Sequence, residues 1–80
     1  MKCIITEFGI FTLENMNSIT IDDVGEDWQV TLDYRDNHLV VSLYKHHDKK
    51  RCKDLLEEIS RQMVCEDKDV IDISYYHGKE

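Results

Sequence analysis

The spacing of apolar residues changes once along this 80-residue chain, and the change restricts the folds that the chain can adopt. Up to about residue 44, apolar and polar residues alternate, as they do in β-strands that bury one face. Beyond residue 48, apolar residues follow the period of an α-helix, at positions 52, 55, 56, 59 and 63. Strands followed by one helix predict an α+β fold rather than alternating parallel units.

The alternating half of the chain predicts about five strands, separated by turn residues. In the clearest strand Trp28, Val30, Leu32 and Tyr34 point to one face. The strand after it is expected to bury its odd-numbered apolar residues from 39 to 43, leaving Val40 and Tyr44 outside. The expected strands are residues 3–6, 10–13, 18–22, 28–34 and 38–44, with turns at 7–9, 23–27 and 35–37.

The helical half predicts one amphipathic helix over residues 48–64, with Asp48 as its N-cap. The segment 70–76 is β-prone and could form a final strand, and residues 77–80 are expected to be frayed. The whole chain, 1–80, is expected to form a single domain. Its predicted architecture is a curved antiparallel sheet of about five strands, capped on one face by the C-terminal helix.

Composition and charge limit the classes of function. The chain is 41% hydrophobic and 34% charged, which is typical of a globular protein, and its net charge is −7. This acidity disfavours general attraction to nucleic acid or to an anionic membrane, and no apolar run reaches the ~20 residues of a membrane span. Three cysteines without paired spacing do not suggest a disulfide framework, so we expect a reducing, cytoplasmic location.

One basic island interrupts the acidic sequence. Five of the ten Lys and Arg residues lie within residues 45–53. Cations in the first turn of a helix oppose its dipole, so helix stability does not explain them. They are either a solvated helix start or a binding surface for an anion or an acidic protein. The candidate binding residues of this island are Lys45, Lys49, Lys50, Arg51 and Lys53.

No catalytic or metal-binding pattern is evident. His46 and His47 are adjacent and lack the spacing of a zinc site, and the acidic turn 22–27 lacks the alternating ligands of a calcium loop. Neither a Gly-x-Ser-x-Gly nor a phosphate-binding loop occurs. The cysteines at 3 and 52 are expected to lie in the core, whereas Cys65 is the expected exposed thiol. We therefore expect neither an enzyme nor a bound metal or cofactor.

Three features of the sequence carry a resemblance to a known group of proteins. They are the run Phe-Thr-Leu-Glu-Asn-Met-Asn-Ser-Ile at 11–19, Trp28 at the start of a strand, and the helical pattern Cys52-x-x-Leu55-Leu56-x-x-Ile59. In these features, residues 4–63 resemble small, uncharacterised bacterial and phage proteins with a helix-capped, PH-like antiparallel sheet. The resemblance implies a fold and no functional residues, because the group has no agreed activity.

The remaining candidates are tyrosines outside the predicted core: Tyr44, Tyr75 and Tyr76. Exposed tyrosines are good interface anchors, although these could also pack beneath a terminal segment. The segment 70–76 is expected either to close the sheet or to pair with a second copy in a homodimer. The favoured function is a non-catalytic protein-interaction module. The alternatives are a phage-encoded inhibitor of a host defence system that mimics nucleic acid and, less favoured, a nucleic-acid-binding protein acting through residues 45–53.

Overall fold

The computed structural model of the chain describes residues 2–35 and 39–76. Within these ranges five strands precede the helix and one follows it, in the order predicted from the sequence. A π-helical turn, η1, extends the helix at its C-terminal end. The elements are β1 (Cys3–Thr6), β2 (Gly9–Thr12), β3 (Met16–Asp23), β4 (Trp28–Tyr34), β5 (Val40–His46), α1 (Lys49–Ser60), η1 (Arg61–Cys65) and β6 (Val70–Asp72).

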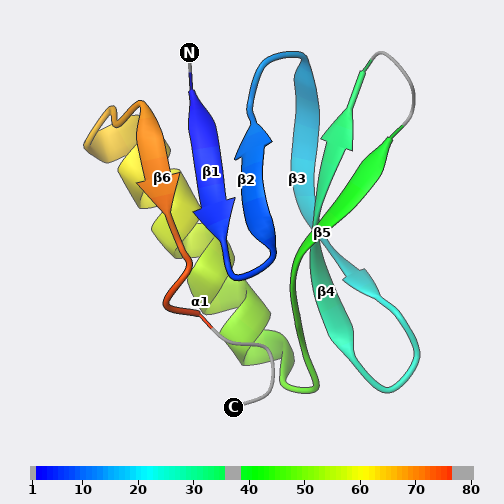
Figure 1. The fold of residues 1–80 in the computed structure, drawn as a ribbon. Helices are drawn as coiled ribbons and strands as arrows, with labels where there is room; N and C mark the ends of the chain where they lie inside the picture. The colour runs from blue at the N-terminus through cyan, green and yellow to red at the C-terminus, as the bar shows by residue number, and fades with distance from the viewer. Residues whose placement is uncertain (1, 36–38, 77–80) are drawn as a thin grey trace.

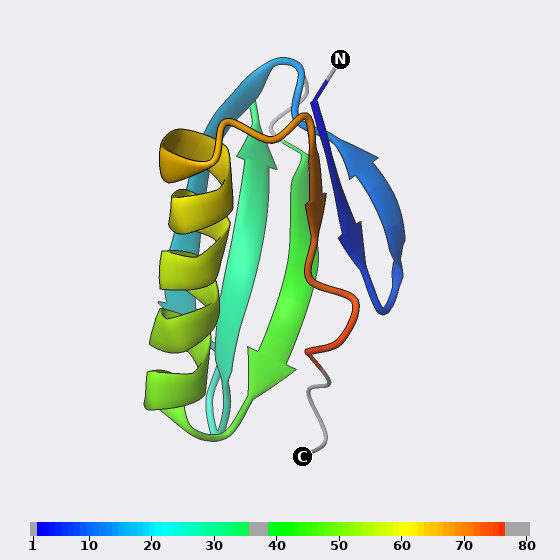
Figure 2. The same ribbon diagram turned by 90° about the vertical axis from the view of Figure 1, so that its left-hand side faces the viewer.

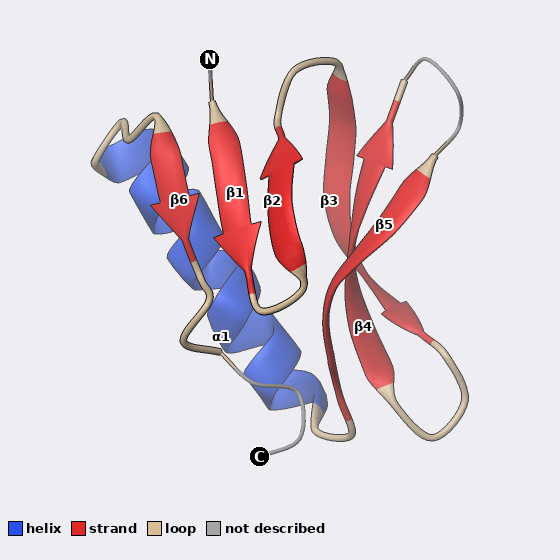
Figure 3. Cartoon of the chain, in the orientation of Figure 1, coloured by secondary structure: helices blue, strands red, loops and turns tan. Residues whose placement is uncertain are grey.

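The strands form two three-stranded sheets instead of the expected single sheet of about five (Figures 1 and 3). One sheet is the antiparallel meander β3-β4-β5. The other has the order β2-β1-β6, in which β1 is antiparallel to β2 and parallel to β6. The chain passes from one sheet to the other between β2 and β3, where Leu13 is buried and Asn15 adopts a φ of 60°. This left-handed residue redirects the backbone, so β2 and β3 do not pair.

A bulge in β5 changes which residues of that strand are buried. Tyr44 lies opposite Val30 and Ser42 opposite Thr31, so Leu43 is an additional residue. Leu43 and Tyr44 are consequently both buried, each with 1% of its surface exposed. Of the two expectations for Tyr44, exposure as an interface anchor is therefore wrong, whereas packing beneath a terminal segment is observed, against Tyr76. Just before the strand, Leu39 is 53% exposed instead of buried.

The helix begins as the sequence predicts. The Asp48 carboxylate accepts a hydrogen bond from the Lys50 backbone N–H at 3.0 Å, which confirms Asp48 as the N-cap. Cys52, Leu55 and Ile59 are buried, whereas Leu56 and Met63 at the side of the stripe are half-buried. The helix packs along β3, β4 and β5 (Figure 2).

Both sheets and the helix share one hydrophobic core. The final strand belongs to it, because Ile71 and Ile73 are fully buried and residues 70–72 pair with residues 3–5 of β1. The segment 70–76 therefore closes a sheet within the chain, one of the two predicted outcomes. The core residues are Ile4, Leu13, Val30, Leu32, Leu43, Tyr44, Cys52, Leu55, Ile59, Ile71 and Ile73.

Some predictions fall outside the part of the chain that the structure describes. These are the frayed end at 77–80, most of the turn at 35–37, and residue 38 of the fifth predicted strand. Among the residues that are described, no helix has the length and apolar character needed to cross a membrane.

Candidate functional site

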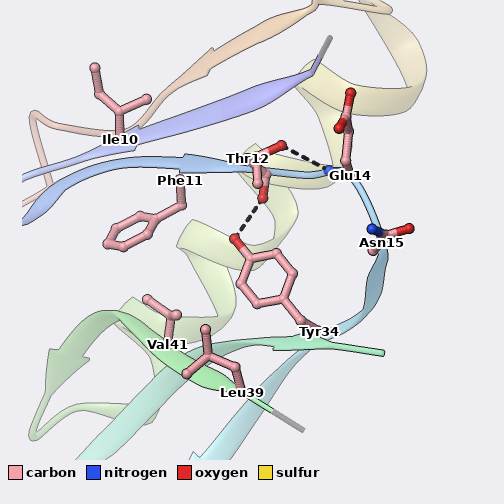
Figure 4. Close-up of a pocket in the computed structure, with 8 residues that line it drawn as sticks. All are labelled: Ile10, Phe11, Thr12, Glu14, Asn15, Tyr34, Leu39 and Val41. Carbon is pink, nitrogen blue, oxygen red and sulfur yellow. Dashed lines mark hydrogen bonds between the residues drawn. The ribbon is translucent and has the colours of Figure 1, made fainter. Parts of the chain in front are cut away.

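An open apolar pocket lies between β2 and the adjoining ends of β4 and β5 (Figure 4). Its volume is about 470 Å³. Phe11 points from β2 into the space between the sheets, toward Val41 and Leu39 of the β5 side, whereas the Ile10 side chain points away from Phe11. The lining residues are Ile10, Phe11, Thr12, Glu14, Asn15, Tyr34, Leu39 and Val41.

A hydrogen bond between the two sheets closes one end of the pocket. The Tyr34 hydroxyl, from the end of β4, donates to the backbone carbonyl oxygen of Thr12 at 2.6 Å (Figure 4). Burial raises the pKa of Tyr34 above its ordinary value, so the hydroxyl stays protonated and able to donate throughout the neutral range. The bond anchors β2 to the β3-β4-β5 sheet at this end.

The pocket leaves large apolar surfaces exposed. Leu39 is 53% exposed and Ile10 is 70% exposed, while Phe11 and Val41 are half-buried. Of the lining residues that the structure describes, Glu14 is the one whose side chain carries a charge at neutral pH, and it makes no ion pair with any residue in the described ranges. Contiguous apolar surface with a polar rim is typical of binding sites.

The basic island lies at the opposite end of β5, where Lys45 belongs to the strand and the other four cations follow it. Part of its charge already contacts groups of the chain itself: the Lys45 ammonium lies 4.0 Å from an Asp27 carboxylate oxygen, and the Lys49 ammonium lies 4.4 Å from the centroid of the Trp28 ring. Arg51 is half-buried, whereas Lys50 and Lys53 are exposed. The structure thus brings the five predicted cations to one end of the molecule, and Lys50 and Lys53 present their charge most openly.

The three candidate tyrosines occupy different environments. Tyr44 is buried, with its ring stacked 6.0 Å from that of His46 and edge-on to that of Tyr76 at 5.9 Å. Tyr76 is half-buried, and Tyr75 is 57% exposed. Tyr75 therefore remains a candidate surface anchor, whereas Tyr44 packs beneath the segment that follows β6.

Glu58 links the end of α1 to the end of the chain. Its carboxylate accepts hydrogen bonds from the Arg61 guanidinium, from the Gln62 amide at 2.7 Å and from the Tyr75 hydroxyl at 3.4 Å. The hydrogen bonds from Arg61 and Gln62 hold the pKa of Glu58 below its ordinary value. This network is a structural feature of the helix end, because its donors satisfy the carboxylate without leaving an open site.

The thiols and the imidazoles do not converge on a reactive centre in the described part of the chain. Cys52 is buried, and burial raises the pKa of its thiol, whereas Cys65 is exposed as predicted. His46 is buried, and its Nδ1 accepts a hydrogen bond from the Asp48 backbone N–H at 3.0 Å. Across residues 2–35 and 39–76, no group of three or more His, Cys, Asp or Glu side chains could hold a metal ion.

The pocket was not anticipated from the sequence. Its lining comes from strands separated by more than twenty residues, and their proximity depends on the division into two sheets. One local signal was present, because Ile10 and Phe11 are adjacent apolar residues in a strand. Adjacent side chains of a strand point to opposite faces, so a single core on one side of the sheet could not bury both.

Comparison of the chain with models of protein families, with curated protein sequences and with solved structures finds no match. The resemblance to helix-capped, PH-like proteins therefore stays a prediction, and the site is interpreted from its own geometry.

Proposed function

We propose that this protein is a non-catalytic protein-interaction module that binds an apolar segment of a partner in the pocket between β2 and β5. The observation that carries the proposal is the apolar, open pocket of about 470 Å³. Contact of an apolar surface with water is unfavourable. Covering the surface is favourable by about 25 cal/mol per Å² of apolar area. A partner segment that fills the pocket would recover that free energy.

The chemistry of the lining supports binding rather than catalysis. The Tyr34 hydroxyl is engaged with the Thr12 carbonyl, and the lining residues within 2–35 and 39–76 include no cysteine, serine or histidine. Glu14 and Asn15 are polar groups on the rim, where they could fix the orientation of a bound chain.

The charge distribution favours a cationic partner at this site. The chain carries a net charge of −7, and its basic island lies at the far end of β5 from the pocket. Long-range attraction then raises the association rate of a positively charged segment, and added salt reduces that rate. The exposed cations at Lys50 and Lys53 are a second surface, suited to an acidic group of the same partner or of another.

The experiment uses a displayed library of random linear 12-residue peptides, selected on the immobilised protein. Leu39→Ser removes an apolar pocket wall, and we expect it to weaken the selected peptides at least tenfold. Val40→Ser is the matched control, because Val40 is the next residue and 56% exposed, but points to the opposite face of the strand. Selected peptides that bind both variants as well as the original protein would contradict the proposed site.

A further inference from the structure

The backbone of β2 has an edge that no residue in the described part of the chain pairs with. The Leu13 backbone N–H donates to the Lys2 carbonyl oxygen at 2.9 Å, which identifies these two residues as a hydrogen-bonded pair of the antiparallel ladder. Along an antiparallel ladder, hydrogen-bonded pairs alternate with non-hydrogen-bonded pairs. Ile10 and Thr12 belong to non-hydrogen-bonded pairs, so their backbone N–H and carbonyl groups point away from β1. The bond from Tyr34 to the Thr12 carbonyl, on the side away from β1, agrees with this orientation.

Three polar groups of this edge remain open. They are the N–H and the carbonyl of Ile10 and the N–H of Thr12, none of which has a hydrogen-bond partner among residues 2–35 and 39–76. The edge borders the apolar pocket, because both residues also line it. A chain that lies along β2 can therefore form backbone hydrogen bonds and bury a side chain in the pocket at the same time.

The sequence of β2 also differs from the sequences of the other strands that lie at the edges of the two described sheets, β3, β5 and β6. Edge strands are usually protected from unwanted pairing by charged residues or proline. The strands β3, β5 and β6 contain Asp22 and Asp23, Lys45, and Asp72, respectively. The sequence of β2 is Gly-Ile-Phe-Thr, with no charge and no proline. β2 is thus the edge strand whose sequence least opposes pairing.

From these observations we infer that the partner is an extended peptide that adds to β2 as a fourth strand of the β2-β1-β6 sheet. One of its side chains, an apolar one, enters the pocket, and a Lys or Arg lies beside Glu14. Glu14 supports the choice of a cation, because it is a charged lining residue and makes no ion pair within the ranges described. The inference rests on the proposed function and specifies its ligand as a β-strand.

A helical segment fits this surface less well than a strand. A helix satisfies its own backbone groups, so it would cover the open groups of Ile10 and Thr12 without bonding to them. Each buried group left unbonded weakens binding, because its hydration is lost without a replacement hydrogen bond. A strand satisfies the same groups with its own amides and presents alternate side chains to the pocket.

The test begins with the tightest 12-residue peptide from the selection described above. It is resynthesised with a single N-methyl group at each position in turn, which removes one backbone donor and leaves the side chains unchanged. In a strand paired with β2, alternate amides face β2. A methyl group at such a position either removes the donor to the Ile10 carbonyl or collides with the β2 backbone, so we expect affinity to fall at least tenfold at every second position over the bound stretch. On the protein, Ile10→Pro removes the open N–H and should cause a similar loss. Ile10→Thr changes the same pocket-lining side chain but keeps the N–H. Ile10→Pro should therefore bind at least tenfold more weakly than Ile10→Thr.

Two controls make the result specific. Circular dichroism and a thermal melt establish that Ile10→Pro is folded. The N-methyl series tests the backbone hydrogen bonds without altering the protein, so it does not depend on the folding of any variant. In a parallel selection, Glu14→Gln should remove the enrichment of Lys and Arg among the bound peptides.

The outcomes separate this inference from the function on which it rests. Binding that depends on Leu39 but lacks a period of two in the N-methyl series would overturn the strand model and leave the interaction module intact. Binding independent of Leu39 would overturn both. If the protein instead self-associates at the concentrations used, and Ile10→Pro abolishes this, the occupant is a second copy, and the choice of a separate cationic peptide is wrong.

Discussion

Two tyrosine hydroxyls of this molecule are in opposite situations. The Tyr44 hydroxyl is buried and has no hydrogen-bond partner in the described part of the chain, whereas that of Tyr34 donates to the Thr12 carbonyl at 2.6 Å. A buried polar group without a partner costs about 1–3 kcal/mol, and a formed hydrogen bond contributes about 0.5–1.5 kcal/mol. The same removal of one oxygen should therefore change stability in opposite directions at these two positions.

We predict that Tyr44→Phe raises the free energy of unfolding by up to about 1–3 kcal/mol, and that Tyr34→Phe lowers it by about 0.5–1.5 kcal/mol. Urea unfolding followed by circular dichroism measures both, with the slope of the transition as a check that the unfolded states are alike. A loss of stability in Tyr44→Phe would show that the hydroxyl has a partner in solution, such as a bound water.

Single residues also mark where sequence reasoning succeeded. The bounds of β1 and β4 and the cap at Asp48 were predicted correctly, because alternation and capping are local signals. The burial of Tyr44 in its strand was not, because a bulge adds one residue to β5. The exposure of Leu39 was not either, because this residue precedes β5 and lines the open pocket. A bulge depends on the pairing of two strands, and a one-residue change moves every later side chain to the other face.

At the scale of elements, the start of α1 contains two neighbouring lysines with different surroundings. Lys49 lies over the Trp28 ring, whereas Lys50 is exposed in the first turn of the helix. A cation–π contact at an exposed site contributes about 0.5–1 kcal/mol. A cation near a helix N-terminus is unfavourable, by about 0.3–1 kcal/mol.

We therefore predict that Lys50→Glu keeps or raises the melting temperature, while Lys49→Glu loses the contact with Trp28 and gains less or is destabilised. Thermal melts of the two variants at low salt make the comparison, and 0.5 M salt should reduce the effect of Lys50→Glu. Equal melting temperatures for the two variants would indicate that the contact with Trp28 contributes nothing.

The other end of the helix should respond to acid. Because the pKa of Glu58 is lowered in the folded protein, its carboxylate adds stability above its ordinary pKa, which is near 4.5. That stability is lost as the pH falls through the lowered, folded-state pKa. Arg61 is about half exposed, so solvent screens part of the effect.

We expect the urea midpoint of the original protein to fall more steeply between pH 5 and about pH 3 than that of Glu58→Gln. Glu57→Gln, at an exposed neighbouring position, is the control and should follow the original protein. Identical pH profiles for all three proteins would show that the Arg61 and Gln62 contacts do not persist in solution.

At the scale of the whole molecule, the fold class and the order of elements followed from the sequence, whereas the division into two sheets did not. The parallel pairing of β6 with β1 joins residues more than sixty positions apart, and no local pattern reports such a contact. The pocket between β2 and β5 depends on the same long-range arrangement. Periodicity assigns a strand a buried face but does not identify its neighbours.

The final strand offers a matched test of this arrangement. Ile71 is fully buried beside β1, whereas the adjacent Val70 is about half exposed. We predict that Ile71→Ala costs about 2–5 kcal/mol and that Val70→Ala costs well under half of this. Denaturant midpoints give the comparison, and a small loss of stability in both variants would mean that β6 is a passive attachment.

The homodimer through residues 70–76 stays a prediction. Light scattering of the same samples tests it.

The pairing of β6 with β1 also has a consequence for the order in which the protein can fold as it is made. Synthesis runs from the N-terminus at about 5–20 residues per second, so residues 3–6 leave the ribosome seconds before their partners at 70–72 exist. The meander β3-β4-β5 can acquire α1 from the residues that directly follow it, but the hairpin β1-β2 must wait with one side of β1 unpaired. During this interval β1 offers nascent chains and chaperones a temporary binding edge that the finished fold conceals.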